Sequence, residues 1–84
     1  MLRKRWNIRL STEVRADYSQ IPRGEAANFR DAIAVLYEGP QPTGIEIIVL
    51  DAGVFEYRLN GYRILFEVLD RDTIRVMGFE RLTY

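Results

Sequence analysis

Two arginines, Arg58 and Arg63, flank an Asn-Gly pair in the segment YRLNGYRILFEV. The Asn-Gly pair favours a two-residue hairpin turn, because both central positions of that turn need positive φ angles. Such a turn places Arg58 directly opposite Arg63, where like charges repel. A guanidinium group is a planar fork that binds phosphate oxygens in bidentate fashion. The pair therefore indicates either a solvated surface, with the arginines directed toward Glu56 and Glu67, or a phosphate-binding site.

Hydrophobic alternation sets the register of the strands around these arginines. A two-residue loop in the next hairpin would place Arg75 in the core, so we expect the three-residue loop 70–72, with Phe66 opposite Val76. The apolar face of the sheet then comprises Phe55, Tyr57, Leu59, Tyr62, Ile64, Phe66, Val68, Ile74 and Val76. The other face carries Glu56, Arg58, Arg63, Leu65, Met77, Phe79 and Arg81. Because apolar and aromatic side chains alternate with cations there, that face suits phosphate contacts combined with base stacking.

The elements that position these residues follow from the periodicity of the apolar side chains. Residues 5–11 alternate as a strand, and residues 12–21 and 23–38 show helical spacing on either side of Pro22. Four further strands are predicted at 44–50, 54–59, 62–69 and 73–82. The order β-α-α-β-β-β-β predicts an α+β fold, a twisted antiparallel sheet with a two-helix hairpin packed on one face.

Composition excludes several classes of chemistry. The 84 residues contain no cysteine and no histidine, which removes disulfides, thiol nucleophiles, the usual zinc ligands and the commonest general acid–base. We expect one domain, residues 1–84, with no membrane segment, metal or cofactor, in the cytoplasm. The net charge is zero, but residues 1–30 carry seven basic and three acidic side chains, whereas residues 31–57 carry five acidic and no basic ones. Any site for a polyanion must therefore be local.

The segment YRLNGYRILFEVLDRDTIRVMGFERLTY, together with the element order, resembles the RelE/ParE superfamily of bacterial toxins. The family pattern is a basic residue before a turn, then Gly-Tyr-Arg and an apolar strand, then a Val-Gly-like step, a basic stretch and a tyrosine. Arg58, Gly61, Arg63, Gly78 and Tyr84 carry the resemblance, which covers nearly the whole chain.

The resemblance implies the toxin of a type II toxin–antitoxin pair, a RelE-like endoribonuclease that cuts mRNA on the ribosome without a metal. The 2′-hydroxyl of the RNA attacks the adjacent phosphate, which requires charge stabilisation and two proton transfers. By this resemblance Arg63 contacts the scissile phosphate, Arg58 and Arg81 assist it, and Tyr84 stacks on a base or accepts a proton. The partners implied are a cognate antitoxin, expected on the arginine face and the helical hairpin, and the ribosome with its mRNA.

Other interpretations remain open. RelE-like chains often carry basic residues where this one has Glu56 and Glu80, so a ParE-like inhibitor of DNA gyrase, which is not an enzyme, is the alternative. An inactive member that only binds its antitoxin is another. Phe79, Met77 and Arg75 are candidates for RNA contacts, and Glu56 is a candidate general base or a salt-bridge partner of Arg58. Two carboxylates in the loop 70–72 are more typical of a turn than of a metal site.

Overall fold

The computed structural model describes residues 4–82. The elements along the chain are β1 (Asn7–Leu10), α1 (Thr12–Tyr18), η1 (Arg23–Glu25), α2 (Ala26–Ala34), η2 (Val35–Glu38), β2 (Ile48–Asp51), β3 (Val54–Leu59), β4 (Tyr62–Val68) and β5 (Thr73–Arg81). The predicted α+β order is confirmed, but β2 begins at Ile48, whereas the strand was predicted at 44–50. The helices are shorter than predicted, and the second one begins and ends in 3₁₀ turns. None of the helices described is long and apolar enough to cross a membrane.

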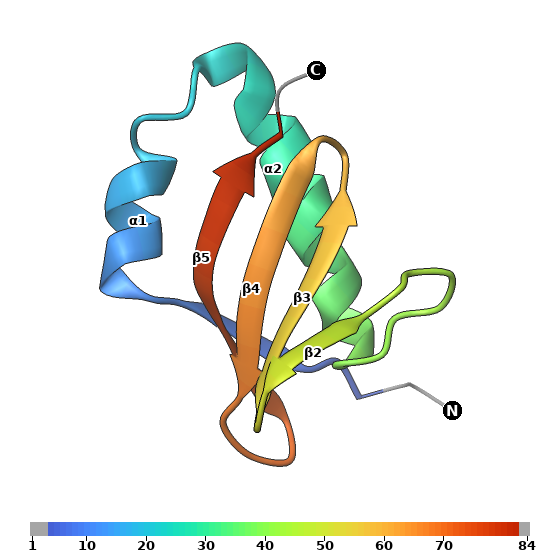
Figure 1. Cartoon of the computed structure of the whole chain (residues 1–84). Coiled ribbons are helices and arrows are strands. Elements are labelled where there is room, and N and C mark those ends of the chain that lie inside the picture. Colours follow the sequence, from blue (N-terminus) through green and yellow to red (C-terminus); the bar gives the residue numbers. More distant parts are fainter. Residues whose placement is uncertain (1–3, 83–84) are drawn as a thin grey trace.

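The five strands form one sheet in the order β1-β5-β4-β3-β2 (Figure 1). The strands β2 to β5 are antiparallel neighbours, as predicted, but β1 pairs with β5 in parallel, with Ile8 beside Ile74 and Leu10 beside Val76. The sheet is therefore mixed rather than wholly antiparallel. Hydrophobic alternation indicates which face a strand buries and carries no information about its direction.

Helix α2 lies behind the sheet in Figure 1, and α1 lies beside β5. Both contribute to one core, whose buried members are Val14, Phe29, Ala32, Ile33, Leu36, Tyr57, Tyr62, Ile64, Phe66, Ile74 and Val76. The hydroxyl of Tyr57 donates a hydrogen bond of 2.6 Å to the carbonyl of Ala32, which ties β3 to α2. Burial raises the pKa of Tyr57 well above its ordinary value, so the phenol stays protonated as this donor.

The first hairpin confirms the predicted register, and the second confirms it from the loop as far as the pair of Phe66 and Val76. Asn60 and Gly61 have φ angles of 54° and 82°, and Arg58 stands opposite Arg63. In the second hairpin Phe66 stands opposite Val76, with the three-residue loop 70–72 between the strands. Asp70 accepts a hydrogen bond from the backbone N–H of Asp72 at 3.0 Å, which confirms the turn interpretation of the loop carboxylates.

Asp72 makes the second hairpin sensitive to acid. The Thr73 hydroxyl donates to its carboxylate at 2.9 Å and Lys4 Nζ lies 3.3 Å away. The hydrogen bonds from Thr73 and the loop, together with Lys4, hold the pKa of Asp72 below its ordinary value of 3.8. A lowered pKa means that the ionised carboxylate stabilises the fold above pH 3.8, and that this contribution is lost as the pH falls through the folded-state value.

We therefore expect Asp72→Asn to lower the thermal midpoint at neutral pH. The difference between variant and parent should shrink as the pH falls below about 4, where the parent carboxylate is also protonated. Thermal unfolding of both proteins across this pH range checks the prediction. A difference that is the same at every pH would contradict it.

Candidate functional site

The sheet surface turned away from α2 carries most of the charged side chains predicted to form the site. We call it the open face. Cross-strand pairs place its members in three rows across the strands, except Met77, which has no cross-strand partner and lies beside the second row. The rows are Arg9, Arg75, Glu67 and Val54; then Leu65, Glu56 and Ile48; and then Glu80, Arg63 and Arg58.

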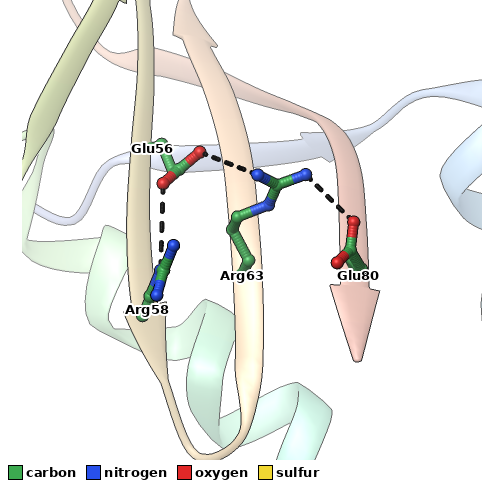
Figure 2. A network of polar contacts seen from close by, with 4 residues as sticks. All are labelled: Glu56, Arg58, Arg63 and Glu80. Carbon is green, nitrogen blue, oxygen red and sulfur yellow. Dashed lines mark hydrogen bonds and ion pairs between the residues drawn. The ribbon is translucent and has the colours of Figure 1, made fainter. Parts of the chain in front are cut away.

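Arg63 lies at the centre of a polar network on this face (Figure 2). Its Nη2 is 3.0 Å from Glu80 Oε2 and its Nη1 is 3.6 Å from Glu56 Oε1. Arg58 Nε lies 4.0 Å from the other oxygen of Glu56. The carboxylate of Glu56 thus bridges the two arginines, and this bridge offsets the repulsion between them.

Burial makes Glu56 the least accessible charge of the network. Its side chain is 8% exposed, against 35% for Arg63 and 62% for Arg58. A carboxylate removed from water in this way depends on its guanidinium partners. Arg63 Nε is also buried and has no hydrogen-bond acceptor within residues 4–82. Both terminal nitrogens of Arg63 therefore take part in ion pairs, and its third nitrogen, Nε, has no acceptor among the described residues.

The solvated-surface interpretation predicted carboxylate partners for both arginines, and the partners of Arg63 differ from the prediction. Glu67 instead forms an ion pair with Arg75 across the β4–β5 ladder. Glu80, which the predicted register placed on the core side, takes its position beside Arg63.

A β-bulge in β5 explains why the predicted register did not place Glu80 beside Arg63. Leu65 pairs with Gly78 and Phe66 pairs with Val76, so Met77 is an extra residue in β5. Every side chain after the bulge changes face relative to a regular strand. A regular strand would place Glu80 opposite the buried Tyr62. That conflict, together with a lone glycine inside a strand pattern, is the sequence signal that identifies the bulge.

The bulge corrects the predicted positions of Phe79 and Arg81. Phe79 stands opposite Ile64 and packs in the core, with its ring 4.3 Å from that of Phe29. Arg81 stands opposite Tyr62 and forms an ion pair with Glu25. Neither side chain shares the open face with Arg63.

Comparisons with known proteins bear on the fold. No protein-family model matches the chain, and no curated protein matches it. The isolated RelE toxin of E. coli superposes with a TM-score of 0.71 at 11% identity, over 94% of this chain and 86% of that one. The RelE–RelB complex of Pyrococcus horikoshii OT3 gives a TM-score of 0.69 at 15% identity, over 90% and 93%. The toxin–antitoxin complex RelBE2 of Mycobacterium tuberculosis gives 0.62 at 19%, over 92% and 98%.

The chain has the RelE fold. Within it, the structure brings together Arg58, Arg63 and Glu56 from the sequence-predicted site, with Met77 and Arg75 farther along the same open face. Tyr84 lies outside the described residues.

In this RelE-fold chain, Arg81 and Glu25 lie close enough to Tyr62 to change the pKa of its phenol. Burial and the nearby Glu25 raise the pKa of Tyr62, and Arg81 acts in the opposite direction. The Arg81 guanidinium thus forms an ion pair with the carboxylate of Glu25 and lowers the pKa of the nearby Tyr62 phenol.

Chemically, the open face of this RelE-fold chain can accept an anion at Arg63. Glu80 is exposed on the surface, so its side chain can rotate into water and release Nη2. A phosphate there would receive Nη2, and it would receive the buried Nε as well, as a bidentate pair from one edge of the guanidinium, once the side chain turns outward. Glu56 would remain in place and hold the other edge.

Proposed function

We propose that this protein is the toxin of a type II toxin–antitoxin pair and acts as a RelE-like endoribonuclease on ribosome-bound mRNA. The observation that carries the proposal is an arginine pair, Arg58 and Arg63, on the open face of a fold shared with RelE toxins. Nε of Arg63, which is buried without an acceptor among the described residues of the free protein, would add a donor for a phosphate oxygen once the side chain turns outward. The proposal places the protein in the bacterial cytoplasm as a single domain.

In the proposed reaction, the 2′-hydroxyl of one nucleotide attacks the adjacent phosphate, and the bond to the 5′-oxygen of the next nucleotide breaks. Arg63 stabilises the charge that develops on the phosphate oxygens, and Arg58 adds to the local positive potential. The proton of the attacking hydroxyl passes to Tyr84 or to Glu56, the phosphate becomes a 2′,3′-cyclic phosphate, and the departing 5′-oxygen takes a proton from water. We assign no phosphate contact to Arg81 and no stacking role to Phe79, because both lie away from the open face.

A second candidate is a ParE-like, non-enzymatic inhibitor of DNA gyrase. The observation that favours it is the neutralisation of Arg63 by two carboxylates, Glu56 and Glu80, in a chain of zero net charge. A surface neutralised in this way attracts a polyanion less than a strongly basic one.

One experiment separates the two candidates. The purified protein is added to a translating ribosome system and, in parallel, to gyrase with relaxed plasmid. Cleavage of the mRNA with normal supercoiling supports the ribonuclease. Loss of supercoiling with intact mRNA supports the gyrase inhibitor, and no effect in either assay leaves only an antitoxin-binding protein.

The proposal includes an antitoxin partner, because the Pyrococcus and Mycobacterium structures are complexes of a toxin with its antitoxin. The expected contact surfaces are the arginine face and the helical side. Strand β2 offers a further one. It forms one edge of the sheet, and Ile48, Val49 and Leu50 are all exposed on it. An exposed apolar edge strand is a template for pairing with another chain.

We expect Val49→Lys to weaken binding of the antitoxin encoded beside this gene by at least about tenfold, because an edge lysine opposes strand pairing. Val49 is 68% exposed, so the thermal midpoint should change by no more than about 2 °C. Titration calorimetry with the purified antitoxin measures the affinity. An unchanged affinity would show that the antitoxin does not use β2.

A further inference from the structure

A cleft of about 610 Å³ lies where the open face meets the start of α1. Its charged lining consists of Arg9, Arg15, Arg75 and Glu13, and its apolar lining includes Leu69 and Met77. None of these residues belongs to the polar network of Glu56, Arg58, Arg63 and Glu80.

Hydrogen bonds from one serine fix the walls of this cleft. The backbone N–H of Ser11 donates to the carbonyl of Val76 at 3.0 Å, and its hydroxyl donates to the carbonyl of Met77 at 3.3 Å. The same hydroxyl accepts from the N–H of Val14 at 3.1 Å and caps α1. The turn between β1 and α1 is thereby tied to the β5 bulge, so the cleft is part of the rigid fold.

The arginines of the cleft have fewer carboxylate partners than the arginines around Arg63. Arg9 stands directly opposite Arg75 in the parallel β1–β5 pair, a second like-charge pair on this face. Arg75 is paired with Glu67, but no carboxylate of the described residues lies within ion-pair distance of Arg9 or Arg15. Around Arg63 two arginines face two glutamates. At the cleft three arginines face Glu13 and Glu67.

The cleft and Arg63 lie on one continuous surface. Arg75 stands opposite Glu67, which is four residues along β4 from Arg63. At about 3.3 Å per residue this separation is about 13 Å. Leu65 lies between them on β4, and Met77 lines the side of the cleft. A separation of about 13 Å spans about two nucleotides of an extended single strand, so the two cationic sites match phosphates two positions apart, with bases packed on the apolar surface between them. This alternation favours a nucleic-acid strand over an acidic peptide.

We propose that the cleft is a second phosphate subsite, which binds the backbone of the RNA strand that continues past the phosphate at Arg63. Arg9 and Arg15 are the main contacts, and Arg75 shares its charge with Glu67. This inference rests on the proposed ribonuclease function and adds to it the direction in which the substrate extends. An RNA that reaches both sites should bind more tightly than one that reaches Arg63 alone.

The test compares the binding of two single-stranded RNA probes by fluorescence anisotropy, a trinucleotide and an oligonucleotide of about twelve nucleotides. We expect the parent to bind the longer probe about tenfold more tightly. The double variant Arg9→Ala/Arg15→Ala should lose this advantage and bind the trinucleotide normally. The slope of log K against log salt for the longer probe should become shallower by about 1.4, since each lost phosphate contact accounts for about 0.7.

The matched control is Arg23→Ala/Arg30→Ala, which removes the same charge from exposed positions on the helical side. It should bind both probes within about twofold of the parent. Thermal midpoints of both double variants verify that they are folded.

Several outcomes would overturn the inference. The cleft variant could bind the longer probe like the parent, the control could lose as much affinity, or the cleft variant could lose antitoxin binding alone. These failures are distinct from failure of the proposed function. If the parent cleaves mRNA through Arg63 while the cleft variant behaves like the parent, only the subsite is wrong. If RNA binding depends on the cleft but no mRNA is cleaved, the subsite stands and the ribonuclease function is wrong.

Discussion

We expect Arg63→Ala to abolish cleavage of ribosome-bound mRNA and also to destabilise the free protein. Cleavage is lost because no other guanidinium on the open face replaces the fork that binds the phosphate, while Arg58 supplies only nearby charge. We expect the rate to fall by at least about a hundredfold, the usual consequence of removing a transition-state donor.

The loss of stability follows from Glu56. Removing Arg63 leaves this buried carboxylate with Arg58 at 4.0 Å as its one remaining ion-pair partner among the described residues. An unsatisfied buried charge costs free energy, and the partial exposure of Arg63 keeps the loss to about 1–2 kcal/mol. The sequence alone predicts the opposite sign, a slight gain from relieving the repulsion with Arg58. Urea unfolding measures the free energy, and single-turnover cleavage measures the rate.

Two control variants make this prediction specific. Arg63→Lys keeps the charge and should restore stability more fully than cleavage, because a point charge does not reproduce the bidentate fork. Glu80→Gln removes the exposed carboxylate that competes for Nη2, so cleavage should be at least as fast as in the parent. An Arg63→Ala variant that cleaves at the parental rate would remove the basis of the proposed function.

Phe66→Ala should lower the free energy of unfolding by about 3–5 kcal/mol. Phe66 is fully buried, and its ring lies 5.3 Å from that of Phe55 and 5.8 Å from that of Tyr57. Truncation removes these contacts and leaves a cavity that the surrounding sheet and helix fill only in part. For a domain of this size the loss is a large share of the total stability.

Chemical denaturation of Phe66→Ala and Phe66→Leu checks the value. The leucine variant keeps much of the apolar volume, so it should lose clearly less stability than the alanine variant. A loss below about 1 kcal/mol for Phe66→Ala would mean that β4 does not present this side chain to the core.

The sequence by itself determined the order of the elements, the register of each hairpin next to its turn, and the apolar face of β3 and β4. Each of these depends on local chemistry. Asn60 and Gly61 are residues that accept the positive φ angles of the turn, and the alternation on either side of the second loop excludes a two-residue loop, which would bury Arg75. The opposition of Arg58 and Arg63 follows directly from that turn.

The tertiary structure decided the composition of the site. The bulge at Met77 reverses the faces of the last part of β5, which brings Glu80 to Arg63 and sends Phe79 and Arg81 to the other side. The bulge is favourable because it buries Phe79 against Phe29 and keeps the charge of Glu80 out of the core. This stabilisation depends on α2, which lies some fifty residues earlier in the chain. The parallel pairing of β1 and the cleft beside α1 likewise depend on contacts between distant segments. The alternation of apolar and polar residues within one segment does not predict such contacts.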